Sequence, residues 1–125
     1  MTENSELNQA EEATKEGAKK LANAAIEAAF RAARYGAWGF ELKGYADNPP
    51  EGIDPDEARE AQGACEEASQ ALMRTAATAW GGGWHYLLHG ADDGYEEIHA
   101  DLAKFEKEAI DAILDVSNAM PEGLR

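Results

Sequence analysis

Residues 95–116 read YEEIHADLAKFEKEAIDAILDV, and an apolar side chain recurs there at every third or fourth position. The recurring residues are Tyr95, Ile98, Leu102, Phe105, Ala109, Ala112 and Val116. This spacing is typical of one face of an α-helix that packs against other helices. The stretch therefore predicts a helix over 94–119, with Asp93 as its N-cap and Glu96 as the second residue of a capping box.

A helix over 55–80 is predicted from a start signal and from a stripe of small residues. Asp54 precedes Pro55, and Glu57 follows three residues after the cap, which is a helix N-terminus with proline at the first helical position. The inward face reads Ala58, Ala61, Cys65, Ala68, Leu72, Thr75 and Ala79. Such small side chains let a neighbouring helix lie close. The triplet of glycines at 81–83 then predicts a turn, followed by a short helical segment over 84–89.

The first helix is predicted over about 4–35, because two apolar stripes run along its second half. One stripe holds Leu21, Ala25, Ala28, Ala32 and Tyr35, and Ile26, Ala29, Phe30 and Ala33 lie beside it. An apolar arc of this width predicts that this helix is central, with more than one packed neighbour. Residues 36–54 contain four glycines and two prolines and predict a long connection. Residues 120–125 are expected to form a short tail.

The composition predicts an all-α fold. One valine, five isoleucines and four threonines leave little from which to build strands, whereas 26 alanines favour helix. The expected architecture is a small antiparallel bundle of three long helices, plus the short helix after the Gly-Gly-Gly turn, in one domain over residues 1–125. Because alanine makes up so much of the 44% hydrophobic content, the core should be thin.

The charge excludes several classes of protein. With 25 acidic and 11 basic residues the formal net charge is -14, so direct binding to nucleic acid would be opposed by phosphate repulsion. No apolar run is long enough to cross a membrane, and the N-terminal residues lack the basic and apolar regions of a signal peptide. We therefore expect a cytoplasmic protein. Its single cysteine, Cys65, is expected to be a buried helix residue without a disulfide or a C-x-x-C site.

Residues 80–99 contain the three histidines and two of the three tryptophans. His85 and His89 are one helical turn apart, and Glu96 and His99 form a Glu-x-x-His pair, both of which are spacings that metal sites use. The match is incomplete, because a carboxylate-bridged metal centre needs a second such motif and further inward glutamates. These residues are weak metal candidates, and no cofactor is expected. A small-ligand or metal-binding bundle using this segment, with Trp80 and Trp84, is the alternative function.

Catalytic motifs do not support an enzyme. No Gly-x-Ser-x-Gly is present, and the glycine triplet lacks the Lys-Ser or Lys-Thr of a phosphate-binding loop. Glu66 and Glu67 beside Cys65 would raise the pKa of its thiol, which is the wrong direction for a nucleophile. We expect a non-enzymatic protein with no catalytic residues.

Residues 76–84, AATAWGGGW, resemble the Trp-x-Gly turn of a family of small secreted helical-hairpin proteins, with Trp80 and Gly82 in the motif positions. The resemblance implies a hairpin turn at this point and a C-terminal Tyr-x-x-x-Asp/Glu secretion signal. That signal is missing, because Tyr86 is followed four residues later by Gly90 and Tyr95 by His99. The chain is therefore not assigned to the family.

Unpaired acidic residues cluster in two places, and these clusters carry the leading functional hypothesis. The clusters are Asp92, Asp93, Glu96, Glu97 and Asp101, and Asp47, Glu51, Asp54 and Asp56. The candidate aromatic anchors are Trp38, Tyr45, Trp80 and Trp84. We expect these residues to bind and inhibit a basic partner, such as a nucleic-acid-processing or defence complex, with carboxylates mimicking phosphates as in phage or mobile-element inhibitors and antidotes.

Three alternatives stay open at this point. The acidity could serve solubility in a salt-rich cytoplasm instead of a partner. The aromatic residues of 36–54, Trp38, Phe40 and Tyr45, could form a lid over the helices instead of a binding surface. The heptad stripe of the last helix could pair with a second copy, which would make the protein a homodimer or a larger structural oligomer.

Overall fold

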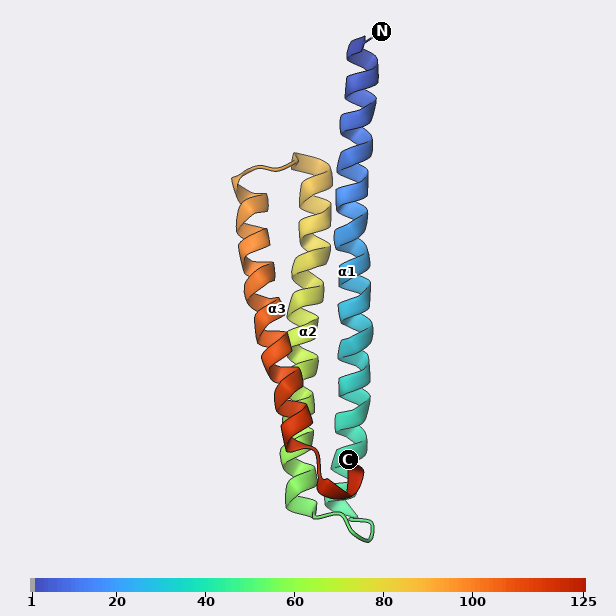
Figure 1. The fold of residues 1–125 in the computed structure, drawn as a ribbon, viewed down its shortest axis with the longest axis vertical. Helices are drawn as coiled ribbons and strands as arrows, with labels where there is room; N and C mark the ends of the chain where they lie inside the picture. The colour runs from blue at the N-terminus through green and yellow to red at the C-terminus, as the bar shows by residue number, and fades with distance from the viewer. Residues whose placement is uncertain (1) are drawn as a thin grey trace.

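The computed structural model describes residues 2–125, with side chains described from Glu11 onward. Its helices are α1 (Thr2–Asp47), α2 (Pro55–His89) and α3 (Asp93–Ala119), followed by a short 3₁₀ helix, η1 (Glu122–Leu124). No strand occurs among these residues, and the prediction of a small all-α bundle of antiparallel helices is confirmed (Figure 1). None of the described helices combines the length and the apolarity needed to cross a bilayer.

The central helix is α2, which lies between α1 and α3 (Figure 1). Within the described chain, the backbones of α1 and α3 each pack against α2 and not against one another. The prediction that the first helix is central is therefore wrong. The reason is that α2 carries small residues on both of its packed sides, whereas the second apolar stripe of α1 stays in solvent, with Ile26 48% and Phe30 69% exposed.

Helix α1 continues through the glycines that predicted a connection over 36–54, so the loop is only 48–54 and the predicted boundary is wrong. Gly39 is buried against α2, where an added Cβ would lie 3.4 Å from the Cβ of Cys65. A glycine inside a helix costs roughly 1 kcal/mol, yet α1 stays helical here and packs against α2. The helix ends before Pro49, because a proline disfavours helical backbone in the residue that precedes it.

Helix α2 also runs unbroken through residues 81–83, so the predicted turn and the separate segment over 84–89 are both wrong. Gly82 and Gly83 are buried between two neighbours. A Cβ added at Gly82 would lie 2.8 Å from Cγ2 of Ile98 in α3. A Cβ added at Gly83 would lie 3.1 Å from the carbonyl oxygen of Ala18 in α1. These glycines therefore make room for both outer helices at one level of α2.

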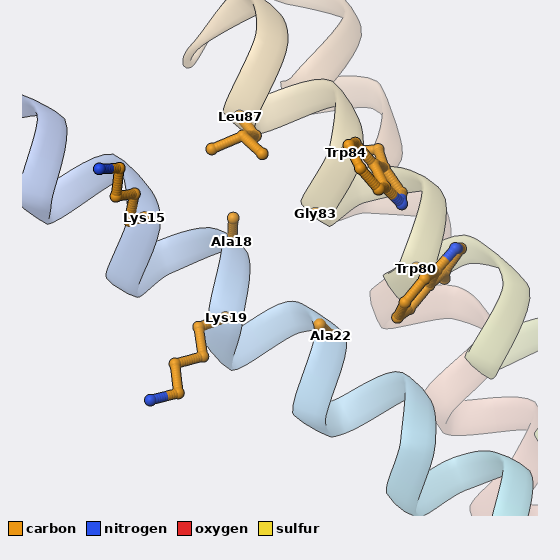
Figure 2. Close-up of a pocket in the computed structure, with 8 residues that line it drawn as sticks. All are labelled: Lys15, Ala18, Lys19, Ala22, Trp80, Gly83, Trp84 and Leu87. Atoms are coloured by element: carbon orange, nitrogen blue, oxygen red, sulfur yellow. The ribbon is translucent and has the colours of Figure 1, made fainter.

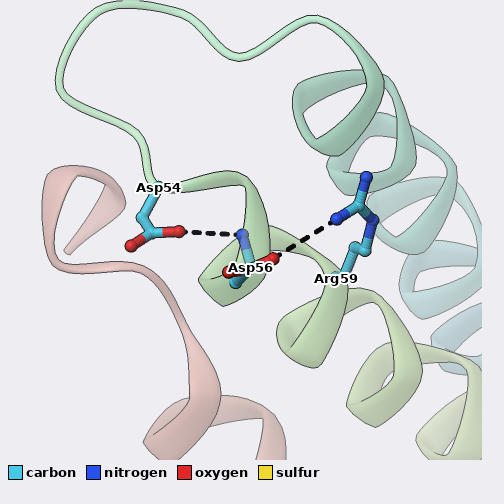
Figure 3. A network of polar contacts seen from close by, with 3 residues as sticks. All are labelled: Asp54, Asp56 and Arg59. Carbon is cyan, nitrogen blue, oxygen red and sulfur yellow. Dashed lines mark hydrogen bonds and ion pairs between the residues drawn. The ribbon is translucent and has the colours of Figure 1, made fainter.

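The start of α2 is as predicted, with Asp54 as N-cap and Pro55 in the first turn. The Asp54 carboxylate accepts a hydrogen bond from the backbone N–H of Asp56 at 2.8 Å (Figure 3). The side chain of Asp56 in turn accepts from Arg59 at 3.3 Å. The cap bond goes to Asp56 rather than to Glu57, so the cap is a simpler one than the predicted capping box.

Helix α3 begins one residue earlier than predicted, and its N-cap is Asp92 instead of Asp93. The Asp92 carboxylate accepts from the backbone N–H of Tyr95 at 2.9 Å. The heptad stripe of α3 turns inward, with Leu102, Ala109, Ala112 and Val116 buried against α2 and α1. This stripe is used within the chain and is not available to pair with a second copy.

Residues 120–125 fold back against the rest of the protein instead of forming a free tail. Pro121 is buried, and an added Cβ at Gly123 would lie 2.8 Å from the carbonyl oxygen of Gly52 in the α1–α2 loop. Arg125 donates from its side chain to the backbone carbonyl oxygens of Met120 and Asn118, each at 3.0 Å. The C-terminus therefore closes the end of the bundle where α1 and α2 are joined (Figure 1).

Candidate functional site

Trp80 and Trp84 lie one helical turn apart on the same side of α2, and 49% and 53% of their surfaces are exposed. Together with Gly83 and Leu87 they border a cavity of about 270 Å³ between α2 and α1 (Figure 2). The opposite wall consists of Lys15, Ala18, Lys19 and Ala22. The cavity is thus apolar, with two lysines on its rim and no acidic residue in its lining.

The histidines do not converge on one point. The rings of His85 and His89 are neighbours, with centroids 4.9 Å apart, but His99 lies edge-on against Tyr95 at 4.4 Å. His85 donates from Nε2 to Oδ1 of Asp92 at 2.6 Å. In the part of the chain described, no group of three or more His, Cys, Asp or Glu side chains is placed to hold a metal ion. His85 and His89 are therefore neighbours, but Glu96 and His99 do not join them in a metal site.

Asp92 links the end of α2 to the start of α3. Two hydrogen bonds hold the pKa of Asp92 below its ordinary value: the larger effect comes from His85, and the smaller from the backbone N–H of Tyr95. A carboxyl group whose pKa is lowered by folding stabilises the fold above its unfolded pKa, and that contribution is lost as the pH falls through the lowered value. Asp92 therefore has a structural role, which accounts for one member of the predicted contact cluster.

We expect the Asp92 carboxyl resonance to titrate at a lower pH in the wild-type protein than in the His85→Phe variant. The substitution removes the largest cause of the lowered pKa and keeps the cap bond from Tyr95, so the midpoint should rise without reaching that of an unfolded chain. A carbon-detected NMR titration of the side-chain carboxyl measures both midpoints. Equal midpoints in the two proteins would show that His85 does not bind Asp92 in solution.

The second predicted cluster lies at the opposite end of the bundle, near the α1–α2 loop. Trp38 and Tyr45 are on α1 and not in a loop, so neither forms the predicted lid. Trp38, 42% exposed, borders a cavity with Ile113 and Met120 of the α3 end. Tyr45 donates to Glu41 at 2.6 Å, and this hydrogen bond raises the pKa of its hydroxyl. Asp47 and Glu51 are exposed, whereas Asp54 and Asp56 make the contacts at the start of α2.

The two predicted clusters cannot form one compact contact surface. Helix α2 separates them, and its 35 residues span about 52 Å. A protein–protein interface of standard size covers about 800 Å² per partner and does not reach that far as a compact patch. The tryptophans at 80 and 84 are also separated from the acids of α3, because none of those acids lines the tryptophan cavity.

The outer side of the α2–α3 pair carries an acidic groove that the sequence analysis missed. Two adjoining hollows of about 360 and 470 Å³ share Glu67 and Asp115 in their lining. The acids on the groove are Glu60 and Glu67 of α2 and Glu108, Asp111 and Asp115 of α3. All five are exposed, and the floor consists mainly of glycine and alanine. We call this feature the acidic groove.

The acidic groove is continuous with part of the predicted α3 cluster. Asp93, Glu97 and Asp101 precede Glu108, Asp111 and Asp115 at helical spacings of three or four residues, with Lys104 in the same row. The row is visible in the sequence, but the unbroken excess of acids that defines the predicted cluster ends at 101, because Lys104 and Lys107 follow. The contribution of α2 was not visible, because Glu60 and Glu67 are far from α3 in the chain.

Two arginines on the acidic groove are already near carboxylates. Arg59 binds Asp56 at 3.3 Å, and Arg74 lies 3.9 Å from Glu108. Neither arginine is free to neutralise the remaining acids, so the groove keeps an excess of negative charge. Exposed ion pairs of this kind are weak, so the carboxylates of the groove remain available to a ligand that brings several positive charges at once.

Cys65 and Ser69 lie in the packed interface between α1 and α2. Cys65 is fully buried, as predicted, and burial, together with the charge of Glu66, raises the pKa of its thiol. The hydroxyl of Ser69 donates to the carbonyl oxygen of Ala32 in α1 at 2.8 Å. Both side chains serve packing between the helices, and neither is arranged for nucleophilic chemistry.

Comparisons with known protein families, curated proteins and solved structures give no match to this chain. The Trp-x-Gly resemblance also fails on geometry, because Trp80 and Gly82 lie inside α2 rather than at a turn.

Proposed function

We propose that the protein is a cytoplasmic, non-enzymatic interaction protein that binds a basic segment of a protein partner in the acidic groove. The observation that carries this proposal is the groove itself, in which acids from two helices border a shallow hollow with a floor of small residues. Complementary charge across such a surface increases the association rate and selects against acidic competitors. If the partner uses the same basic segment to bind its own ligand, occupation of that segment by the acidic groove inhibits the partner.

The spacing of the charges favours a basic protein segment over close imitation of a nucleic-acid duplex. The row on α3 from Asp93 to Asp115 has six acids and one lysine, which is one net negative charge per about 7 Å of helix axis. Duplex DNA carries one per roughly 1.7 Å. A partner therefore needs only a few arginines or lysines at helical spacing to match the row.

The test compares two variants of equal charge in a pull-down from lysate of the source organism. The groove variant carries Glu60→Gln, Glu67→Gln, Asp111→Asn and Asp115→Asn, all of which line the groove. The control variant carries Glu11→Gln, Glu12→Gln, Glu16→Gln and Glu122→Gln, which removes four charges elsewhere. We expect wild type and control to capture the same basic protein in low salt, and we expect the groove variant to lose it.

The affinity of the captured partner makes the test quantitative. Exposed ion pairs contribute about 0.2–1 kcal/mol each, so loss of four should raise the dissociation constant at least about fourfold. Isothermal titration calorimetry with the purified partner measures this change, and added salt should weaken binding to wild type. Equal binding by the groove variant, or no specific capture by wild type at low salt, would show that the acidic groove is not the binding surface.

A further inference from the structure

The side of the α1–α2 hairpin that faces away from α3 carries two exposed apolar stripes. On α1 the stripe is Ala22, Ile26, Phe30, Ala33, Ala37 and Phe40. On α2 it is Met73, Ala77, Trp80, Trp84 and Leu87. Half-buried Ala22 of the α1 stripe and Trp80, Trp84 and Leu87 of the α2 stripe border the same cavity, so the two stripes adjoin at this level (Figure 2). We call this surface the hairpin face.

The spacing along each stripe matches a seam between packed helices. Residues on both stripes follow one another at intervals of three or four, the pattern that places side chains into the gaps of a facing helix. A surface with two parallel seams is complete when two further helices cover it, as in a four-helix core. An occupant with the same hairpin geometry fits this requirement directly.

Among residues 11–125, more large apolar side chains are exposed than buried. Its buried set consists mostly of alanine, with Leu42, Leu72, Leu102, Val116 and Met120 as the large aliphatic members. Twelve large hydrophobic residues of the described chain are exposed, and seven of them lie on the hairpin face. Exposed apolar patches of this extent mark interaction surfaces on soluble domains.

The apolar area of the hairpin face is close to what a stable interface requires. The seven large side chains are between 42% and 79% exposed. At roughly 200 Å² for a large side chain, they expose about 780 Å², against about 800 Å² per partner in a standard interface. A second copy supplies the same area in return, because a two-fold interface uses the same patch on both subunits.

The distribution of charge selects this face for self-association. Two chains of net charge -14 repel one another, but the charge is unevenly distributed along the chain. Residues 15–43 of α1 carry six basic and three acidic residues, whereas α3 carries eight acidic and two basic residues. Approach through the hairpin face therefore keeps the acidic surfaces of the two copies apart, and approach through α3 would bring them together.

We propose that two copies of this chain pack through their hairpin faces and form a homodimer with a four-helix core. In this dimer Trp80 and Trp84 lose their exposure, and side chains of the partner copy fill the cavity beside Lys15 and Lys19. The α3 helices and their acidic grooves lie on the outside. This proposal does not depend on what the groove binds.

The test uses matched isoleucine-to-glutamate variants on two exposed surfaces. Ile26, 48% exposed, lies on the hairpin face, and Ile110, 59% exposed, lies on α3 away from it. We expect wild type and Ile110→Glu to sediment at twice the chain mass of 13.5 kDa. We expect Ile26→Glu and Trp84→Glu to keep their helix content and to raise the dimer dissociation constant at least about a hundredfold, because the added carboxylate would be buried without a partner.

A measurement on the wild-type protein alone keeps the proposal testable if a variant fails to fold. Tryptophan emission should shift to shorter wavelength as concentration rises, because Trp80 and Trp84 become buried, and the unfolding temperature should rise with concentration. Three results would overturn the proposal: a monomer at all concentrations, a dimer that survives Ile26→Glu, and a dimer that Ile110→Glu breaks equally well. A monomer that uses the hairpin face to bind a different protein would overturn it as well.

Discussion

Replacing Gly83 with leucine is expected to destabilise the protein by about 1–3 kcal/mol, the usual cost of overpacking a close interface. An added Cβ at this position would lie 3.1 Å from the carbonyl oxygen of Ala18 and 3.5 Å from the Cβ of Leu21. The nearest of these atoms belongs to the backbone, so the clash is relieved only if α1 moves away from α2. Urea unfolding followed by far-ultraviolet circular dichroism measures the change.

Gly81→Ala is the matched control, and its expected effect has the opposite sign. Gly81 is exposed, and an added Cβ would have no neighbour within 4 Å. Alanine should stabilise α2 there by about 0.5–1 kcal/mol, because it loses less backbone entropy than glycine in a helix. Equal effects of the two substitutions would contradict a continuous, closely packed α2, and a flexible turn at 81–83 would predict that outcome.

Leu42→Ala is expected to cost about 2–5 kcal/mol, since it creates a cavity at a fully buried leucine. Leu42 belongs to the core cluster that also contains Ala61 and Cys65 of α2 and Met120 at the end of α3. It also lies in the part of α1 that the sequence analysis placed in a connection. Total stability of a domain is about 5–15 kcal/mol, so this loss should lower the unfolding midpoint strongly.

Leu114→Ala provides the control for the same chemical change at the surface. Leu114 is 56% exposed on α3, so the substitution should change stability by no more than about 0.5 kcal/mol. Both variants are unfolded in urea at one fixed protein concentration. Comparable small losses in the two would mean that Leu42 is not in the core and that α1 does not extend past residue 40.

The two proposed surfaces are compatible with each other because they lie on different sides of α2. Trp80 and Trp84 border α1, whereas Glu60 and Glu67 border α3. A dimer joined through the hairpin faces would present two acidic grooves on its outside. A partner with two basic segments could then bind more tightly than the affinity of one groove allows.

Much of the fold was predictable because its signals are local. The inward stripe of α2 from Ala58 to Ala79 is buried as predicted, and so are Leu102, Ala109, Ala112 and Val116 of the α3 stripe. The predicted cap at Asp54 is present, since capping depends only on neighbouring residues. The cap of α3 was misplaced by one residue, because two successive aspartates, Asp92 and Asp93, carry the same local signal.

The candidate sites were less predictable, because they depend on which helix faces lie side by side. The sequence placed Trp80 and Trp84 together, but their cavity also needs Ala18 and Ala22 of α1. It identified the acids of the first turns of α3, whereas the acidic groove also requires Glu60 and Glu67 from another helix. Contacts between residues so distant in the chain leave no local pattern.

The sequence by itself determined the all-α class, the direction in which each helix turns its small residues, and the strong excess of acidic charge. Only the tertiary structure decided the role of the glycines. Gly82 and Gly83 read as breaks because glycine is locally unfavourable in a helix, yet each lies where a neighbouring helix leaves little room for a larger side chain. Because its small residues let a helix pack on each side, α2 is the central helix. The backbone of α1 packs against α2 alone, so the second apolar stripe of α1 stays exposed.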